Sequence, residues 1–567
     1  MNKNGKTIIA LIGIAVLVFG VVFGVITLTN NAGRLPADVS EEKAQETLAK
    51  LVKNIRVNTR TPIKGTVKDL GATVQKDTLP DISKYPLVAD VDKSVAETIE
   101  IFSSPEKAGT GTDAWFTEVV EAFNRTRPTV NGKNVGVKLR NVSSGLAVDY
   151  IATGKAVPDL FSPSNELWGE MLTARGVKNV SLLEKRLAGN VPGVLFSKDK
   201  HKDLVEKYGS VNLRNLSQAV RDGEVLMGYT NPFASSTGLN YLLSTLMTFD
   251  KENPLSEKAV QAFNDFSANV PFVAYNTMQM RESALSGSLD GFVLEYQSVM
   301  NMPEIKANYV FTPFGVRHDN PLYSIGKLST TKQAILNQFL KFLKTDEWKA
   351  KASDYGFNQL DDYQYELTPP TGVVISQAQK LWKENKSSGQ PITAVFVADT
   401  SGSMDQGQRL TNLKKSLING ANYIGRENSI GLVSFGSEVN IALPIGKFTL
   451  GQQALLVGTV ESLRAEGGTA MYDAIVVALG MLLDAKEKDP DTKLLLFVLT
   501  DGETNEGLNF DETRGVIKGL KVPVYSIGYN ANLDALQPLS RLNEAAYLNA
   551  DSDDIVYQLA ALFNAQM

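Results

Sequence analysis

Two long apolar runs in the last third of the chain constrain its fold more than any other feature. They are ITAVFVA at residues 392–398 and KLLLFVLT at residues 493–500, and a third run, VPVYSIGYN, begins at residue 522. Nearly continuous apolar runs of this length are typical of parallel strands that helices bury on both faces. We therefore expect a doubly wound α/β domain over residues 391–567, closed by a helix over residues 552–563.

Residues with oxygen-bearing side chains lie at the ends of these runs. The first run leads into Asp399, Ser401 and Ser403 in the spacing D-x-S-x-S, the second into Asp501, and GGTAMYDAI places Thr469 just before a helix. The carboxyl ends of parallel strands meet at one edge of a sheet. The D-x-S-x-S spacing alone is a weak signal, but the three segments together are a strong one.

This combination resembles the von Willebrand factor A (VWA) domain with a complete metal-ion-dependent adhesion site (MIDAS), a Rossmann-like fold. Asp399, Ser401, Ser403, Thr469 and Asp501 match the ligand positions of that family without a departure. The resemblance implies direct ligation of a metal by the three hydroxyls, with the aspartates often acting through water. It also implies that an Asp or Glu of a protein partner completes the coordination.

The chemistry of Mg²⁺ suits such a set, with Mn²⁺ or Ca²⁺ as alternatives. Mg²⁺ prefers octahedral oxygen ligands at about 2.0 to 2.1 Å and retains water. Few direct negative charges leave the ion electrophilic toward a carboxylate. Two alternatives stay open: Asp399 and Ser403 cap the following helix while Asp501 and Gly502 form a turn, or a bound metal only stabilises the fold.

Residues 97–360 alternate strand-like and helical segments, which predicts a second α/β domain. Its strand-like runs end in small hydroxyl residues, where ligands of open α/β sheets bind. Free amides at the start of a helix at 235–238 favour a polar or anionic ligand, although each cluster alone is also a helix cap. The candidate ligand-binding residues are Ser103, Ser104, Ser143, Ser144, Ser162, Ser235, Ser236 and Thr237.

The order of these segments resembles the two-lobed extracellular solute-binding proteins of bacterial ABC importers. The resemblance rests on LDGFVLEYQ, FTPFGVRHDNPLYSIG and QAILNQFLKFLKTDEWKAKASDYGF. It implies a periplasmic-binding-protein-like domain with a small molecule in its cleft and hinge crossings near Ser210 and Ala307. The solute is not specified, and Arg281 and Glu295 fit either the cleft or the surface.

The amino terminus carries a 21-residue run without charge, from Ile8 to Leu28, preceded by Lys3 and Lys6. Such a run spans a bilayer, and the positive-inside rule leaves the terminus cytoplasmic and the rest of the chain outside. We expect residues 1–30 to be a single-pass membrane anchor, with a cleaved signal peptide as the alternative. Residues 31–96 read as a stalk or a small subdomain, and residues 361–390 as a linker.

The composition excludes several classes of function. Cysteine is absent, and His201 and His318 are the two histidines, so thiol nucleophiles and Cys/His zinc sites are excluded. A formal net charge of -5 provides no basic footprint for nucleic acid. We expect a protein that is not an enzyme.

The function expected from the sequence is binding outside the membrane. We predict an anchored adhesion or scaffold protein whose VWA domain binds Mg²⁺ and a partner carboxylate. The alternative is a receptor that delivers a small molecule to an ABC-type permease.

Overall fold

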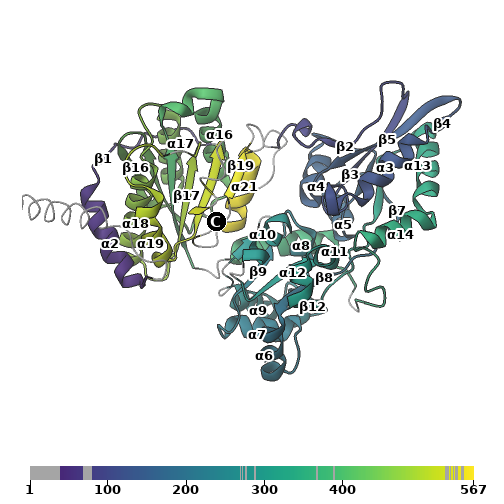
Figure 1. Ribbon diagram of the computed structural model, residues 1–567, viewed down its shortest axis with the longest axis horizontal. Coiled ribbons are helices and arrows are strands. Elements are labelled where there is room, and N and C mark those ends of the chain that lie inside the picture. Colours follow the sequence, from purple (N-terminus) through teal and green to yellow (C-terminus); the bar gives the residue numbers. More distant parts are fainter. Residues whose placement is uncertain are drawn as a thin grey trace, which may run out of the picture. The chain divides into compact units, whose positions relative to one another are not determined.

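The computed structural model describes residues 39–67 and 79–567, apart from 268, 269, 271, 275, 276, 287, 288, 366, 367, 387–389, 503, 530–535, 537, 540, 541, 543–546 and 551–554. The chain divides into two compact units (Figure 1). Unit 1 comprises residues up to 68 with 391–418 and 426–552, and unit 2 comprises 69–390 with 419–425 and 553–567. The predicted anchor at residues 1–30 lies outside the described residues. Within the described ranges, no helix combines the length and apolarity that a membrane crossing needs.

Unit 1 is built on a seven-stranded sheet in which only one neighbouring pair, β15 and β16, is antiparallel. In spatial order the strands are β1 (Val57–Thr59), β16 (Val439–Lys447), β15 (Ser429–Phe435), β14 (Ile392–Asp399), β17 (Lys493–Thr500), β18 (Val524–Tyr529) and β19 (Tyr547–Ala550). The helices of this unit are α2 (Glu41–Asn54), α16 (Arg409–Gly420), α17 (Leu450–Ser462), α18 (Met471–Lys488) and α19 (Phe510–Leu520). Every residue of β14 is buried, as its apolar run predicts. The expected α/β fold of this region is confirmed.

The amino-terminal segment belongs to unit 1, which differs from the stalk expected over residues 31–96. Helix α2 buries Ala44, Leu48 and Leu51 in the core of this unit, and Figure 1 shows it beside α18 and α19. Gly519 of α19 has no side chain, so the Ala44 methyl group packs close to its backbone. Strand β1 then pairs with β16 at the edge of the sheet. The apolar face of α2 is stabilised by burial, which a stalk in water does not provide.

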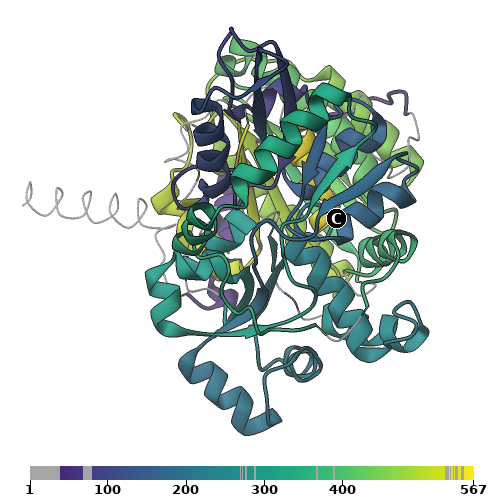
Figure 2. The same cartoon turned by 90° about the vertical axis from the view of Figure 1, so that its right-hand side faces the viewer.

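Unit 2 contains two sheets, one in each lobe, and Figure 2 shows the lobes one above the other. The first sheet runs β2 (Leu87–Ala89), β5 (Lys133–Asn141), β3 (Glu97–Ser103), β6 (Leu160–Ser162), β13 (Leu322–Ile325) and β7 (Val180–Glu184), and β4 (Thr129–Val130) pairs with β5. The second runs β10 (Phe272–Ala274), β9 (Met227–Thr230), β11 (Gly291–Glu295), β8 (Pro192–Ser197) and β12 (Tyr309–Pro313).

Helices alternate with these strands along the chain, as expected for an α/β domain. In the first lobe they are α3 (Trp115–Arg125), α4 (Ser144–Thr153), α5 (Leu167–Ala174), α13 (Thr330–Leu343) and α14 (Asp346–Asp354). In the second lobe they are α6 (Lys198–Tyr208), α7 (Leu213–Arg221), α8 (Ser236–Phe249), α9 (Glu257–Ser267), α10 (Thr277–Ser286), α11 (Tyr296–Met300) and α12 (Pro303–Asn308). Helix α21 (Ile555–Gln566) closes the chain.

The chain crosses between the lobes twice, at residues 185–191 and 314–321. The second crossing lies close to the expected position at Ala307. The first lies well before Ser210, which instead follows α6 inside the second lobe. The sequence expectation was wrong there because β7 and β8 follow each other directly, so the chain changes lobe without an intervening helix.

Two further segments belong to unit 2, although the sequence indicated a stalk and a linker. Leu79 is buried in the core of this unit, and the Tyr150 hydroxyl donates to the Pro80 carbonyl at 2.9 Å. Within the expected linker at 361–390, α15 (Gly372–Asn385) buries Ile375 and Trp382. The apolar spacing of α15 is helical, and burial of that face makes the segment part of the domain.

Candidate metal-binding site and interlobe cleft

The carboxyl edge of the unit 1 sheet places Asp399 and Asp501 on neighbouring strand ends. Asp399 is the last residue of β14, and Asp501 directly follows β17, which pairs with β14 in parallel. Asp399 is fully buried, and the side chain of Asp501 is 7% exposed. The strand pairing therefore fixes both carboxylates at one edge, as the sequence predicted.

Backbone hydrogen bonds join the loop after β14 to the loop between α17 and α18. Gly402 donates to the Gly467 carbonyl at 3.0 Å, and Glu466 donates to the Thr400 carbonyl at 2.8 Å. Gly467 has φ +77°, a conformation that residues with a side chain rarely adopt, and a Cβ there would approach the Ser437 hydroxyl. The tight turn at Gly467 brings the two loops together.

The loop after β17 holds Thr469 from the other side. The Thr469 amide donates to Asn505 Oδ1 at 2.8 Å, and the Thr504 hydroxyl donates to the Thr469 carbonyl at 2.8 Å. The loop that carries Thr469 is thus bonded to both other loops, and the Thr469 hydroxyl has no hydrogen-bond partner among the described residues.

Asp399 is oriented by hydrogen bonds to both carboxylate oxygens. Oδ1 accepts from the Ser401 amide at 2.7 Å, and Oδ2 accepts from the Thr500 hydroxyl at 2.6 Å. Burial raises the pKa of Asp399, and hydrogen bonds from Ser401 and Thr500 oppose that shift. The hydroxyl oxygens of Ser401 and Ser403 lie 3.0 Å apart.

Asp501 is paired with an arginine that the sequence expectation did not include. Arg409 Nη1 donates to Asp501 Oδ2 at 2.9 Å and to the Ser403 carbonyl at 3.2 Å. Arg409 is the first residue of α16, so it reaches back across the loop that carries Ser401 and Ser403.

The donor set fits a hard, oxygen-liganded cation. The structure brings the five predicted residues onto three mutually bonded loops, with three neutral hydroxyls and two carboxylates. Among the described residues no group of three or more His, Cys, Asp or Glu is placed to hold a metal ion. A metal here therefore depends on the hydroxyls, the ligand type that Mg²⁺ accepts in partly hydrated sites.

Five of the eight predicted cleft residues line a cavity of about 50 Å³ in unit 2. These are Ser104, Ser143, Ser144, Ser235 and Ser236. Arg281, Glu295 and Glu106 also line the cavity. The sequence left Arg281 and Glu295 open between the cleft and the surface, and the structure places both at the cleft. Ser103, Ser162 and Thr237 are buried but do not line the cavity.

Most cleft hydroxyls already have partners inside the protein. Ser236 Oγ accepts from Trp168 Nε1 at 2.8 Å and donates to Ser144 Oγ at 3.2 Å. Ser235 accepts from the Gly238 amide at 3.5 Å as the N-cap of α8. Thr237 Oγ1 donates to Glu295 Oε1 at 3.2 Å. The capping alternative therefore describes part of this cluster.

Lys107 is a buried cation beside these strand ends that the sequence did not single out. Its ammonium donates to Ser104 Oγ at 2.5 Å and to the Ser162 carbonyl at 2.9 Å. Burial lowers the pKa of Lys107 to about 8, and the negative charges of Glu106 and Glu295 oppose that shift. The hydroxyl oxygens of Ser103 and Ser162 are buried and find no hydrogen-bond partner in the part of the chain that the structure describes.

A buried ion pair joins the two lobes next to the cavity. Arg281 of α10 donates to both carboxylate oxygens of Asp113, at 2.8 and 3.0 Å. Gln297 Nε2 donates to the Thr112 carbonyl at 3.1 Å. Arg281 and Asp113 are 14% and 11% exposed, so these bonds link the two lobes at a place that is largely shielded from water.

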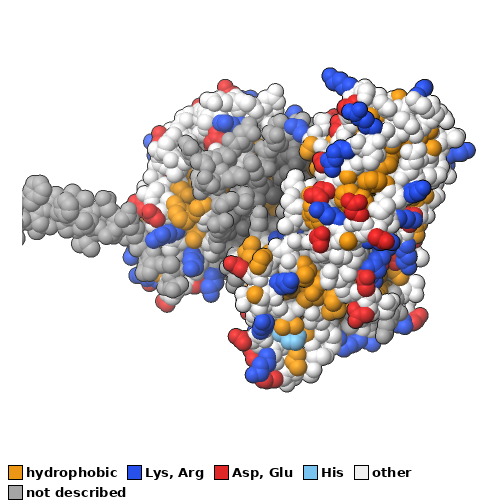
Figure 3. All heavy atoms as spheres, turned by 45° about the vertical axis from the view of Figure 1, so that its right-hand side comes forward, with side chains coloured by type: hydrophobic (Ala, Val, Ile, Leu, Met, Phe, Trp, Pro, Cys, Tyr) orange, Lys and Arg blue, Asp and Glu red, His pale blue; other side chains and the backbone are white. Residues whose placement is uncertain are grey.

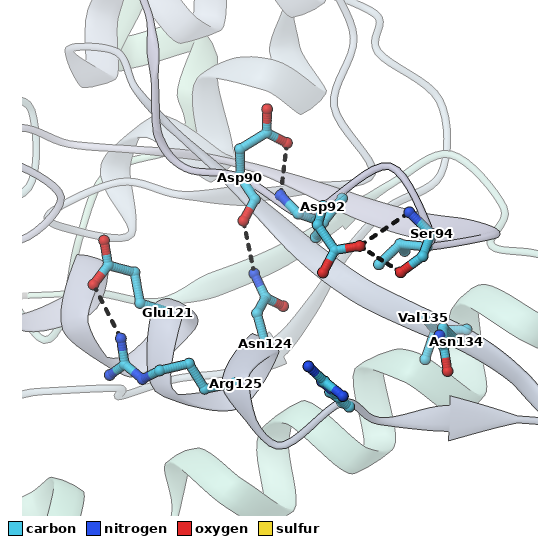
Figure 4. A pocket seen from close by; sticks show the side chains of 11 residues that line it. Asp90, Asp92, Ser94, Glu121, Asn124, Arg125, Asn134 and Val135 are labelled. Atoms are coloured by element: carbon cyan, nitrogen blue, oxygen red, sulfur yellow. Dashed lines mark hydrogen bonds and ion pairs between the residues drawn. The ribbon is translucent and has the colours of Figure 1, made fainter.

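A second, open hollow lies on the first lobe (Figure 4). Its acidic side chains support local turns: Asp92 accepts from the amide and hydroxyl of Ser94, and Glu121 pairs with Arg125 at 3.5 Å. Asn124 donates to the Asp90 carbonyl at 3.4 Å. On the face of unit 2 in Figure 3, basic and acidic side chains are interspersed. The polar side chains that line the hollow therefore have local structural roles in the turns and the helix around it.

Two parts of the chain match known protein families, one in each unit. Residues 108–358 match the family described as bacterial extracellular solute-binding protein, and residues 394–561 match the von Willebrand factor type A domain. The uncharacterized protein YfbK of Escherichia coli K12 is 25% identical over 213 residues, which cover 36% of this chain and 36% of YfbK.

Solved structures similar to each part share little sequence identity. A von Willebrand factor type A protein from Catenulispora acidiphila is 18% identical with a TM-score of 0.28, covering 31% of this chain and 42% of that one. Iron-bound HitA from Pseudomonas aeruginosa is 14% identical with a TM-score of 0.36, covering 52% of this chain and 100% of that one. The family matches confirm the resemblance of the two regions to a solute-binding protein and to a von Willebrand factor type A domain, whereas the metal-ion-dependent adhesion site stays a prediction. The chain combines a domain of the bacterial extracellular solute-binding protein family with a carboxy-terminal von Willebrand factor type A domain.

Proposed function

We propose that the protein is a membrane-anchored, extracytoplasmic binding protein whose VWA domain binds Mg²⁺ and, through it, a carboxylate of a protein partner. One observation carries the proposal: three bonded loops gather three hydroxyls and two carboxylates at one sheet edge. A bound Mg²⁺ supplies an electrophilic site with room for one more oxygen ligand.

The residues of this site would have two roles, as metal ligands and as groups that orient those ligands. Ser401, Ser403 and Thr469 offer neutral ligands, while Asp399 is fixed by Thr500 and the Ser401 amide. A small number of directly bound charges favours an incoming carboxylate over water. The proposed role is binding without catalysis, in keeping with the contacts of the one buried histidine. His318 contacts Glu295, Asn165 and Asn240 and no serine or threonine hydroxyl.

The proposed location outside the cytoplasm rests on the solute-binding domain and on the apolar run at residues 8–28. Solute-binding domains of this family are extracellular by description. The run is long enough to hold the chain at a bilayer. We expect the protein to remain with membranes after a high-salt wash and to be released by detergent.

Calorimetric titration of Mg²⁺ into the full chain tests the metal site. The full chain is needed because α2 and β1 are part of unit 1. We expect a single binding event that is lost in Asp399→Ala. If the wild-type chain and the variant give the same heats, the proposal is wrong.

A second candidate is a solute receptor, which the interlobe cavity favours. Arg281 is neutralised by Asp113, whereas Glu106 is 9% exposed and forms no ion pair within the described residues. Glu106 accepts from the Ser164 hydroxyl. A cavity that offers the Glu106 carboxylate and serine hydroxyls as acceptors, with the nearby cations Lys107 and Arg281 already bonded inside the protein, favours a small hydroxylated or cationic solute over an oxyanion.

Thermal unfolding of the full chain with small probes tests this candidate. The 50 Å³ cavity holds about four water-sized groups, the size of ethanolamine. We expect ethanolamine, but not sulfate, to raise the melting temperature, with the effect lost in Glu106→Gln and kept in the exposed control Glu121→Gln. Stabilisation by sulfate in its place would reverse the assignment of solute charge.

A further inference from the structure

Arg409 occupies a position that the binding scheme above does not explain. Its guanidinium donates from one nitrogen, Nη1, to both Asp501 and the Ser403 carbonyl. It therefore connects the loop after β14 to the loop after β17, the two loops that carry four of the five predicted metal ligands. The Arg409 side chain is 22% exposed, so this contact is largely shielded from water.

Helix stability does not account for a cation at this place. Arg409 begins α16, where the helix dipole disfavours positive charge by about 0.3 to 1 kcal/mol. Its Nε is buried and has no hydrogen-bond partner among the described residues, which adds a cost of desolvation. The contact with Asp501 is the compensating interaction, so the position of Arg409 is set by the site and not by the helix.

The charges at the site give Arg409 two opposite effects. Asp399, Asp501 and Arg409 together leave one net negative charge. A divalent cation converts that to one net positive charge, which an incoming carboxylate cancels. Without Arg409, the cation already neutralises the aspartates, and a carboxylate would then add uncompensated negative charge in a poorly solvated place.

We propose that Arg409 is a positioning residue that weakens metal binding by pairing with Asp501 and strengthens carboxylate binding once the metal is bound. The inference rests on the proposed function of this site. When the metal takes over Asp501, the guanidinium is released. Its Nη2, which donates no hydrogen bond within the described residues, can then donate to an oxygen of the partner carboxylate beside the metal.

Metal titration of full-chain variants tests the first effect. Arg409→Met keeps an unbranched apolar stem and removes the charge, whereas Arg409→Lys keeps the charge. We expect Arg409→Met to bind Mg²⁺ about tenfold more tightly than the wild-type chain, a change of about 1.4 kcal/mol. Arg409→Lys should stay close to wild type, and circular dichroism checks that both variants fold.

Acetate titration into the Mn²⁺-loaded chain tests the second effect, read from the relaxation of water protons near Mn²⁺. We expect acetate to displace bound water less readily in Arg409→Met, with an affinity several-fold lower than in wild type. Equal Mg²⁺ affinity of wild type and Arg409→Met would overturn the inference while leaving the metal site intact, and so would unchanged acetate affinity. Absence of Mg²⁺ binding from both chains would overturn the proposed function as well.

Discussion

The two units use the same residue types at the same kind of place, but in different ways. In unit 2 the hydroxyls of Ser144, Ser235 and Ser236 are bonded to one another, to Trp168 or to a helix amide. In unit 1 the hydroxyls of Ser401 and Ser403 are likewise hydrogen-bonded to each other, at 3.0 Å, but the Thr469 hydroxyl makes no hydrogen bond within the described structure. Hydroxyl residues lie at strand ends in both units, whereas a hydroxyl without a hydrogen bond to the described residues is seen at the unit 1 site in Thr469.

The largest expected effect is a loss of Mg²⁺ affinity in a variant of the unit 1 site. Asp399→Ala removes the carboxylate that Ser401 and Thr500 orient, so we expect Mg²⁺ binding to fall at least a hundredfold, by about 3 kcal/mol. Isothermal calorimetry on the full chain measures it. Asp405→Ala, which removes an exposed carboxylate in the same loop, is the matched control and should bind normally. Strong Mg²⁺ binding by Asp399→Ala would place the metal elsewhere.

The next effect concerns where unit 1 begins. Leu48→Ala leaves a cavity between α2 and the core of this unit, and we expect a loss of about 3 kcal/mol in its unfolding free energy. Urea denaturation with separate fluorescence and circular dichroism probes resolves the transitions of the two units. Lys50→Ala changes an exposed residue of the same helix and should have little effect. An unchanged transition in Leu48→Ala would mean that α2 does not stabilise this unit in solution.

A third effect tests how firmly unit 2 is closed. Arg281→Gln leaves Asp113 buried without its positively charged partner, although Gln297 still donates to it at 3.2 Å, so we expect about 2 kcal/mol of destabilisation. Thermal unfolding measures the loss. Arg221→Gln, which breaks the exposed pair with Asp265, serves as the comparison and should change little. Equal melting curves for the two variants would remove the ion pair as the feature that holds the lobes together.

The smallest effect is the dependence of stability on pH that Lys107 of unit 2 contributes. The unfolded chain keeps the ordinary pKa of 10.5 for Lys107, whereas burial lowers it to about 8 in the fold. Between these values the unfolded state binds more protons, so this group makes stability rise with pH by about 1 kcal/mol per pH unit at most. Lys107→Met should flatten that rise in denaturation curves between pH 8 and 10. An identical rise in wild type and variant would assign it to other groups.

The five predicted metal-site residues could be found from sequence because each follows a strand or precedes a helix that its own apolar pattern defines. Arg409, Thr500 and Asn505 could not be found in the same way. Their roles depend on contacts between loops that are far apart in the chain, such as that of Asn505 with Thr469. Five of the eight predicted cleft residues line the cavity, and the local patterns did not distinguish these five from the three that are buried beside it.

The boundaries of the units were the least predictable feature. The polar stretches and prolines of residues 31–96 indicate a stalk, yet α2 and β1 pack with a domain that begins more than 300 residues later. Helix α15 did carry a usable signal, since Ile375, Ala378, Gln379 and Trp382 have helical spacing and are all buried. Periodicity shows that a helix has an apolar face, but not which domain covers it.

The sequence by itself determined the fold class of both domains and the oxygen chemistry of the candidate metal site, because strand and helix periodicity and the D-x-S-x-S spacing are local. Tertiary structure alone decided that α2 and β1 pack with the part of unit 1 that follows residue 391. It also decided that Arg281 pairs with Asp113 between the lobes and that Arg409 pairs with Asp501. Those outcomes depend on which distant side chains share a buried place, where an unpaired charge or an uncovered apolar face is costly.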